Sequence, residues 1–156
     1  YPLAYHGLGE LFVLVFFGLV AVGGTFYVHS LQLTAPVLIA GLAVGSLATV
    51  LIVINNLRDL ENDRKSNKRT LAARFGERFA RAEVAFFALT PLVAIPWIAW
   101  LGDQPWLLVT LVALPLALGV IFRVKRSRGA ELNRCLAMAG GLQWAFGILF
   151  IIGCII

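Results

Sequence analysis

Residues 55–71 read NNLRDLENDRKSNKRTL, and long apolar segments stand on both sides of them. This polar stretch holds three of the eight acidic residues and five of the thirteen basic residues of a chain that is 60% hydrophobic. It begins with Asn55 and Asn56, in what should be the last turn of an apolar helix. Polar groups are costly there unless they face a cavity or a partner. The stretch therefore indicates a polar site at a helix end, although an ordinary solvated loop is also rich in charge.

The spacing of the acidic residues suggests what such a site would bind. If the apolar helix continues into the stretch, Asn55, Asp59 and Asp63 fall at i, i+4 and i+8 on one face. Asn56 lies beside that face, and the two carboxylates are one turn apart, about 6 Å along the axis. Mg²⁺ usually takes one or two carboxylates together with water and phosphate oxygens. Lys68 and Arg69 would supply positive charge to the same phosphates.

The composition predicts a membrane protein. The 156 residues have a mean hydropathy of +0.89, and only 13% of them are charged. Runs of about 20 mostly apolar residues recur, each long enough to cross a hydrocarbon core of about 30 Å. We expect an all-α, multi-span transmembrane helix bundle with five spans, at about 10–29, 36–57, 82–101, 105–122 and 135–156.

The net charge of +5 indicates membrane orientation rather than nucleic-acid binding. All thirteen Lys and Arg lie in two segments, 58–81 and 123–134, and two expected spans separate these segments. Both segments should therefore lie on one side of the membrane, which the positive-inside rule makes the cytoplasmic side. Pairs of small residues such as Gly41 and Gly45 favour close packing of the expected second span.

The motif of residues 55–76, NNxRDxxxD followed by KRTLxxRxG, resembles the second aspartate-rich motif of the UbiA superfamily of intramembrane prenyltransferases. It is most similar to the motif of the 1,4-dihydroxy-2-naphthoate polyprenyltransferases of menaquinone biosynthesis. The opening YPLAYHGLGELFV, residues 1–13, and FFG, residues 16–18, resemble the loop and helix start that precede this motif in the same enzymes. Asn67 stands where the family commonly has Gly, a change expected in a surface turn.

The resemblance implies that residues 1–156 are a UbiA-like prenyltransferase transmembrane domain, the C-terminal part of a roughly nine-span fold with two aspartate-rich motifs. It assigns catalysis to Asp59 and Asp63, which would hold Mg²⁺ with Asn55 and Asn56. The implied diphosphate-binding residues are Arg58, Lys68 and Arg69. The residues expected at the aromatic acceptor are Glu10, Tyr5 and His6. Glu10 would equally suit a helix N-terminus without any substrate contact, and His6 could simply be solvated.

The implied reaction is the Mg²⁺-dependent transfer of a polyprenyl group from polyprenyl diphosphate to 1,4-dihydroxy-2-naphthoate. Its products would be demethylmenaquinone, diphosphate and CO₂. The implied location is the cell's inner (cytoplasmic) membrane, crossed several times, with the active-site loops on the cytoplasmic side. The expected partners are the two substrates and the lipid bilayer, with no nucleic acid.

The sequence leaves other interpretations of the function open. The acceptor could be homogentisate or 4-hydroxybenzoate, and the chain could be a catalytically inert fragment. A transporter or ion-binding bundle would carry ionisable residues near the midplane of several spans. The expected spans place only Gln143 at that depth, which disfavours transport.

Overall fold

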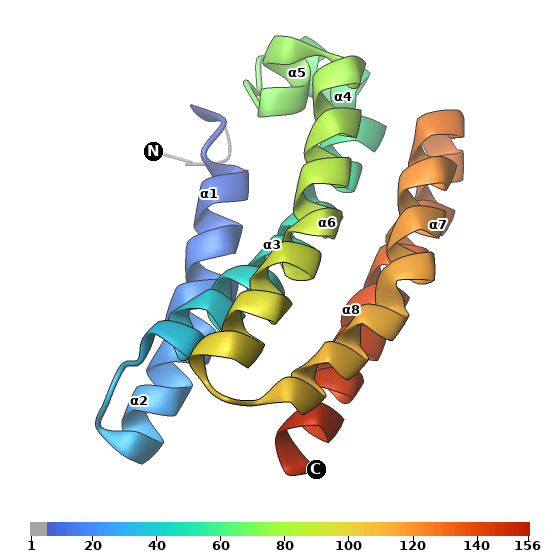
Figure 1. Cartoon of the computed structure of the whole chain (residues 1–156). Coiled ribbons are helices and arrows are strands. Elements are labelled where there is room, and N and C mark those ends of the chain that lie inside the picture. The colour runs from blue at the N-terminus through green and yellow to red at the C-terminus, as the bar shows by residue number, and fades with distance from the viewer. Residues whose placement is uncertain (1–5) are drawn as a thin grey trace.

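The computed structural model describes residues 6–156, and every regular element among them is a helix (Figure 1). Five helical segments of this part of the chain are long and apolar enough to cross a membrane: Gly9–Ser30, Ala35–Arg58, Glu77–Leu101, Pro105–Arg126 and Gly129–Ile155. The predicted all-α, five-span architecture is therefore confirmed, and the protein is a multi-span membrane protein.

Several spans consist of more than one element. The first joins α1 (Gly9–Val13), the π-helical η2 (Leu14–Gly23) and α2 (Gly24–Ser30), and the second is α3 (Ala35–Arg58). Two short helices follow, α4 (Leu60–Lys65) and α5 (Leu71–Phe75), and the third span is α6 (Glu77–Leu101). The fourth joins the 3₁₀ segment η3 (Pro105–Ala113) to α7 (Leu114–Arg126), and the fifth joins η4 (Gly129–Glu131) to α8 (Leu132–Ile155).

The predicted spans were too short wherever a helix continues into charged residues. α6 begins at Glu77 instead of 82, and α7 ends at Arg126 instead of 122. The prediction followed the apolar residues alone. A helix that leaves the hydrocarbon core can continue for a further turn with charged side chains, because its backbone remains hydrogen-bonded.

α3 is the central helix of the bundle, and it contacts η2, α6 and α8 (Figure 1). Its residues Ala43, Val50, Val53 and Ile54 are almost completely buried. The polar motif begins at the end of this helix, so the most enclosed element of the bundle fixes its position.

Glycines allow η2 and α3 to cross with their backbones in contact. A Cβ atom on Gly18 would lie 2.5 Å from the carbonyl oxygen of Gly41, and one on Gly45 would lie 2.7 Å from that of Leu14. The predicted close packing at Gly41 and Gly45 is confirmed.

We expect Gly45→Ala to destabilise the protein by about 1–3 kcal/mol, because the new methyl group would push against backbone rather than a movable side chain. Thermal unfolding in detergent would measure the loss. Gly147→Ala in α8 is the control, since a Cβ atom there meets nothing within 4 Å. Equal midpoints for both variants would contradict the proposed contact.

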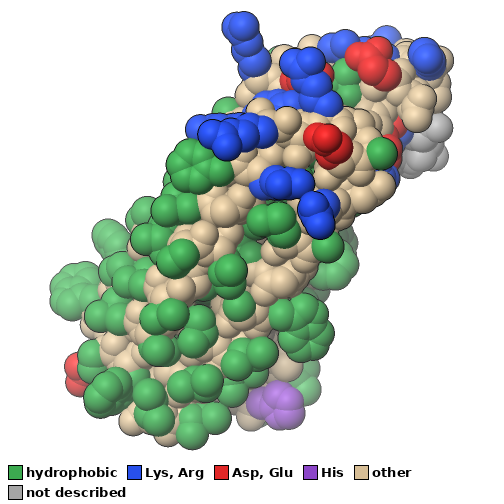
Figure 2. All heavy atoms as spheres, turned by 90° about the vertical axis from the view of Figure 1, so that its right-hand side faces the viewer, with side chains coloured by type: hydrophobic (Ala, Val, Ile, Leu, Met, Phe, Trp, Pro, Cys, Tyr) green, Lys and Arg blue, Asp and Glu red, His purple; other side chains and the backbone are tan. Residues whose placement is uncertain are grey.

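The two ends of the bundle differ in charge. Figure 2 shows Lys and Arg side chains gathered at one end, above a body covered by hydrophobic side chains. α4, α5 and the last turns of α7 lie at that end, whereas the C-terminus and the links between spans at 31–34 and 102–104 lie at the other (Figure 1). Both basic segments therefore share one end, as predicted. We call it the basic end.

Candidate active site

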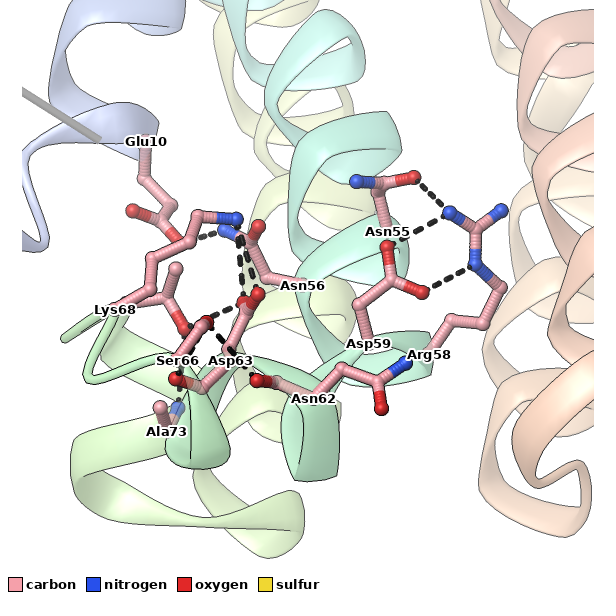
Figure 3. A network of polar contacts seen from close by, with 11 residues as sticks. Glu10, Asn55, Asn56, Arg58, Asp59, Asn62, Asp63, Ser66, Lys68 and Ala73 are labelled. Atoms are coloured by element: carbon pink, nitrogen blue, oxygen red, sulfur yellow. Dashed lines mark hydrogen bonds and ion pairs between the residues drawn. The ribbon is translucent and has the colours of Figure 1, made fainter. Parts of the chain in front are cut away.

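The helix that carries the motif is interrupted at Asp59. α3 ends at Arg58, Asp59 has φ −93° and ψ 7°, and α4 starts at Leu60. Backbone hydrogen bonds still link Asp59 N to Asn55 O at 3.0 Å and Asp63 N to Asp59 O at 2.8 Å. The helix therefore does not continue without interruption through the motif, which was the condition for placing Asn55, Asp59 and Asp63 on one face. Asp59 and Asp63 remain close in the chain, but their carboxylates engage different partners (Figure 3).

Arg58 organises the Asp59 side of the motif. Its Nε and Nη2 atoms donate to the two carboxylate oxygens of Asp59, each at 2.8 Å. Nη2 also donates to Oδ1 of Asn55 at 2.7 Å, and Nη1 donates to Oδ1 of Asn133 at 2.7 Å. Asp59 and Asn55 are visible with Arg58 in Figure 3. The sequence did not point to Asn133, which lies in the first turn of α8.

The hydrogen bonds from Arg58 hold the pKa of the Asp59 carboxyl below its ordinary value. Burial acts in the opposite direction but is the smaller effect, and the positive charge of Lys68 lowers the pKa further. Asp59 is therefore anionic at neutral pH.

Asp63 is buried, with 6% of its surface exposed, and Lys68 neutralises it. The Lys68 Nζ atom lies 3.2 and 3.3 Å from the two carboxylate oxygens, and the Thr70 hydroxyl donates to Oδ2 at 3.3 Å. Thr70 also accepts a hydrogen bond from the Ala73 amide and so caps α5. The loop between α4 and α5 thus folds back and brings both partners to Asp63.

Asn56 and Glu10 form a buried pair between α3 and α1, each 4% exposed. Asn56 Nδ2 donates to Glu10 Oε1 at 2.9 Å, and Figure 3 shows this pair beside Lys68 and Asp63. Glu10 Oε2 is buried and has no hydrogen-bond partner among the described residues. Glu83 of α6 likewise has a buried, unpartnered Oε2 and interacts electrostatically with Glu10. Glu83 was missed because it lies in the apolar start of an expected span.

Arg69 and His6, two further predicted residues, lie around the same end. Arg69 follows Lys68 and is exposed, and its carbonyl oxygen lies against Gly7, where a Cβ atom would come within 2.8 Å. The loop before α1 therefore packs on the loop after α4. His6 is exposed on that loop, and Tyr5 lies outside the described residues.

The donors present suit a cation that binds together with phosphate. No group of three or more His, Cys, Asp or Glu in residues 6–156 is arranged to hold a metal ion by itself. Asp59 and Asp63 nevertheless offer carboxylates, and Asn55 and Asn56 offer amide oxygens, at one end of α3. Mg²⁺ binds through such small oxygen sets when substrate phosphates complete its coordination. The residues therefore fit Mg²⁺ as a ligand shared with a diphosphate.

Comparison with known proteins agrees with the motif. A 1,4-dihydroxy-2-naphthoate octaprenyltransferase of Haemophilus influenzae is 34% identical over an alignment 165 residues long, gaps included. The alignment covers 99% of this chain and 51% of that relative. A protein of the same name from Mycobacterium tuberculosis is 38% identical over 161 residues, covering 95% of this chain and 54% of the relative. The UbiA prenyltransferase domain-containing protein 1 homolog of Drosophila melanogaster is 27% identical over 150 residues, covering 96% and 41%.

The chain spans about half the length of the curated relatives it matches. No solved structure gives a significant match. The family model described as the UbiA prenyltransferase family matches residues 1–151, which is nearly the whole chain. The resemblance inferred from the motif is thus confirmed, and the chain belongs to the UbiA prenyltransferase family.

Proposed function

We propose that this chain supplies the second aspartate-rich motif of an enzyme that transfers a polyprenyl group from polyprenyl diphosphate to 1,4-dihydroxy-2-naphthoate. The products are demethylmenaquinone, diphosphate and CO₂. One observation carries the proposal: anionic, amide and cationic side chains of the motif converge at one end of an otherwise apolar bundle. The names of the relatives from H. influenzae and M. tuberculosis support the naphthoate as acceptor.

The carboxylates of Asp59 and Asp63, with the amides of Asn55 and Asn56, are the proposed ligands for Mg²⁺. Bound Mg²⁺ would neutralise charge on the diphosphate group of the donor. Asp59 is suited to this role because its carboxyl, like that of an ordinary aspartate, is ionised at neutral pH. Because the chain is about half the length of its relatives, we propose that helices carrying the first motif complete the site.

Lys68 and Arg69 are the proposed phosphate-binding cations. Lys68 holds Asp63 through a flexible side chain, so its ammonium group can turn from the carboxylate to a phosphate oxygen nearby. Positive charge placed there stabilises the diphosphate as it leaves. The apolar spans exclude water from the allylic cation that remains.

Glu10 is the proposed contact for the aromatic acceptor. Its buried Oε2 lacks a hydrogen-bond donor among the described residues, and a hydroxyl group of the naphthoate would provide one. His6 and Tyr5 precede Glu10 in the sequence and remain predicted acceptor contacts. For the orientation, we propose that the basic end faces the cytoplasm, because that end carries both basic segments. We also propose that the membrane is the inner membrane, which is the location implied by the family resemblance.

An acceptor comparison tests the proposed reaction. Membranes that contain the protein in full-length form should prenylate 1,4-dihydroxy-2-naphthoate but not homogentisate or 4-hydroxybenzoate, when each is supplied with the same polyprenyl diphosphate. Product is measured by chromatography. In the same assay, the variant Glu10→Gln should raise the KM for the naphthoate more than the KM for the diphosphate. Preferred conversion of another acid would overturn the naphthoate assignment, and no conversion of any acid would overturn the enzymatic proposal.

A further inference from the structure

The Arg58 side chain is largely committed to the protein itself. A guanidinium group has five N–H donors in a rigid planar fork, and four hydrogen bonds from this group to protein oxygens are present. They reach Asp59 twice, Asn55 once and Asn133 once. An arginine in this arrangement fixes the side chains around it and has little capacity left to bind a substrate phosphate.

Asn133 is the one partner of Arg58 in this set that lies outside the motif. It is 75 residues further along the chain, in the first turn of α8, and its contact with Arg58 is 2.7 Å long. Its neighbours Leu132 and Cys135 are buried in the core at 1% and 0% exposure. They fix the start of α8, so the amide group of Asn133 has a defined position although its side chain is exposed.

Asp59 needs such a support because it stands where α3 is interrupted. Its backbone has left the helical conformation, and both of its carboxylate oxygens accept hydrogen bonds from Arg58. The chain of contacts runs from the core-anchored start of α8 through Asn133 and Arg58 to Asp59. Asn55 is held by the same guanidinium group.

We propose that Asn133 is a positioning residue for the metal-binding side chains: it orients Arg58, which in turn orients the carboxylate of Asp59 and the amide of Asn55. This inference rests on the proposed function, because it assumes that Asp59 and Asn55 are ligands. It replaces the diphosphate-binding role that the sequence resemblance implied for Arg58. It also assigns a role in the site to α8, the span farthest from the motif in sequence.

The test is a Mn²⁺ titration of the purified full-length protein, followed by electron paramagnetic resonance, with inorganic pyrophosphate as the phosphate probe. Asn133→Ala should weaken Mn²⁺ binding about tenfold, the effect of losing one hydrogen bond to a charged group. Asn133→Asp should restore binding, since a carboxylate at this position can accept the same hydrogen bond from Arg58. Asn62→Ala, which removes an exposed amide from α4, is the matched control and should bind Mn²⁺ like the wild type.

A KM comparison and thermal unfolding separate positioning from other roles. Positioning predicts that Asn133→Ala raises the Mg²⁺ concentration for half-maximal activity while the KM for polyprenyl diphosphate, at saturating Mg²⁺, changes less. Unchanged Mn²⁺ binding in Asn133→Ala would overturn the inference, as would a rise in the diphosphate KM alone. The inference would also be overturned if Asn133→Asp failed to restore Mn²⁺ binding and both variants had equally lowered thermal midpoints. That result would indicate that the bond between Asn133 and Arg58 is purely structural.

The same titration separates this inference from the proposed function. If the wild-type protein binds no Mn²⁺ with pyrophosphate, the metal-dependent function fails and this inference fails with it. If wild-type binding is clear and Asn133→Ala matches it, only the positioning role fails.

Discussion

Replacing Asp63 with alanine should abolish prenyl transfer, with kcat/KM falling by about a thousandfold or more, because a metal-binding carboxylate and its charge are lost together. Asp63 is the more enclosed of the two acids, and both of its oxygens already lie within hydrogen-bond distance of Lys68. Asp59→Ala should have an effect of the same order. Activity is measured as prenylated naphthoate formed in membranes of matched protein content.

Two further variants keep this prediction independent of folding. Asp63→Asn preserves the size of the side chain and an acceptor for the Thr70 hydroxyl, so it should remain folded and still be inactive. Glu61→Ala removes an acid from α4 whose side chain is 75% exposed and is paired across the helix surface with Arg64, so it should retain activity. Substantial activity in both Asp59→Ala and Asp63→Ala would remove the metal assignment.

Lys68→Met should be the second most damaging change, and it should act on both stability and substrate binding. It leaves the buried Asp63 carboxylate without its cation, which should cost about 2 kcal/mol of stability. It also removes a proposed partner of the diphosphate, and the KM for polyprenyl diphosphate should rise about a hundredfold. Thermal unfolding and steady-state kinetics measure the two effects separately.

A double variant separates the two roles of Lys68. Lys68→Met combined with Asp63→Asn removes the unpaired buried charge, so it should recover stability without recovering activity. Lys65→Met, at an exposed lysine of α4, should leave both quantities close to those of the wild type. If Lys68→Met has an unchanged KM for the diphosphate, Lys68 serves only as the structural partner of Asp63.

The fold could be predicted from the sequence because each span is long and apolar, and hydropathy alone reports this property. The ends of the spans were harder to predict from the sequence. Glu77 and Arg126 look like loop residues by composition, yet both belong to helices that continue beyond the apolar segment. The close contact at Gly41 and Gly45 could also be predicted from the sequence, because small residues four apart favour close helix packing.

The gathering of the motif's polar residues at one end of α3 could be predicted, but the arrangement of these residues could not. Spacing placed Asp59 and Asp63 on one helix face, and the structure breaks the helix between Arg58 and Leu60. Arg58 is adjacent to Asp59 in the sequence, but it also reaches Asn133 in α8, and Lys68 returns to Asp63 through a loop. Glu83 stood at the apolar start of an expected span, and Asn133 fell in the expected basic loop before the last span. Only tertiary structure brings them to Glu10 and Arg58.

We propose that Asp59 and Asp63 hold a divalent cation through which the diphosphate is bound. The most direct test is pyrophosphate-dependent Mn²⁺ binding by the full-length protein, compared between the wild type and the double variant Asp59→Asn, Asp63→Asn. We expect saturable Mn²⁺ binding in the wild type and loss of this binding in a double variant that remains folded. Equal Mn²⁺ affinity in the two proteins would contradict it.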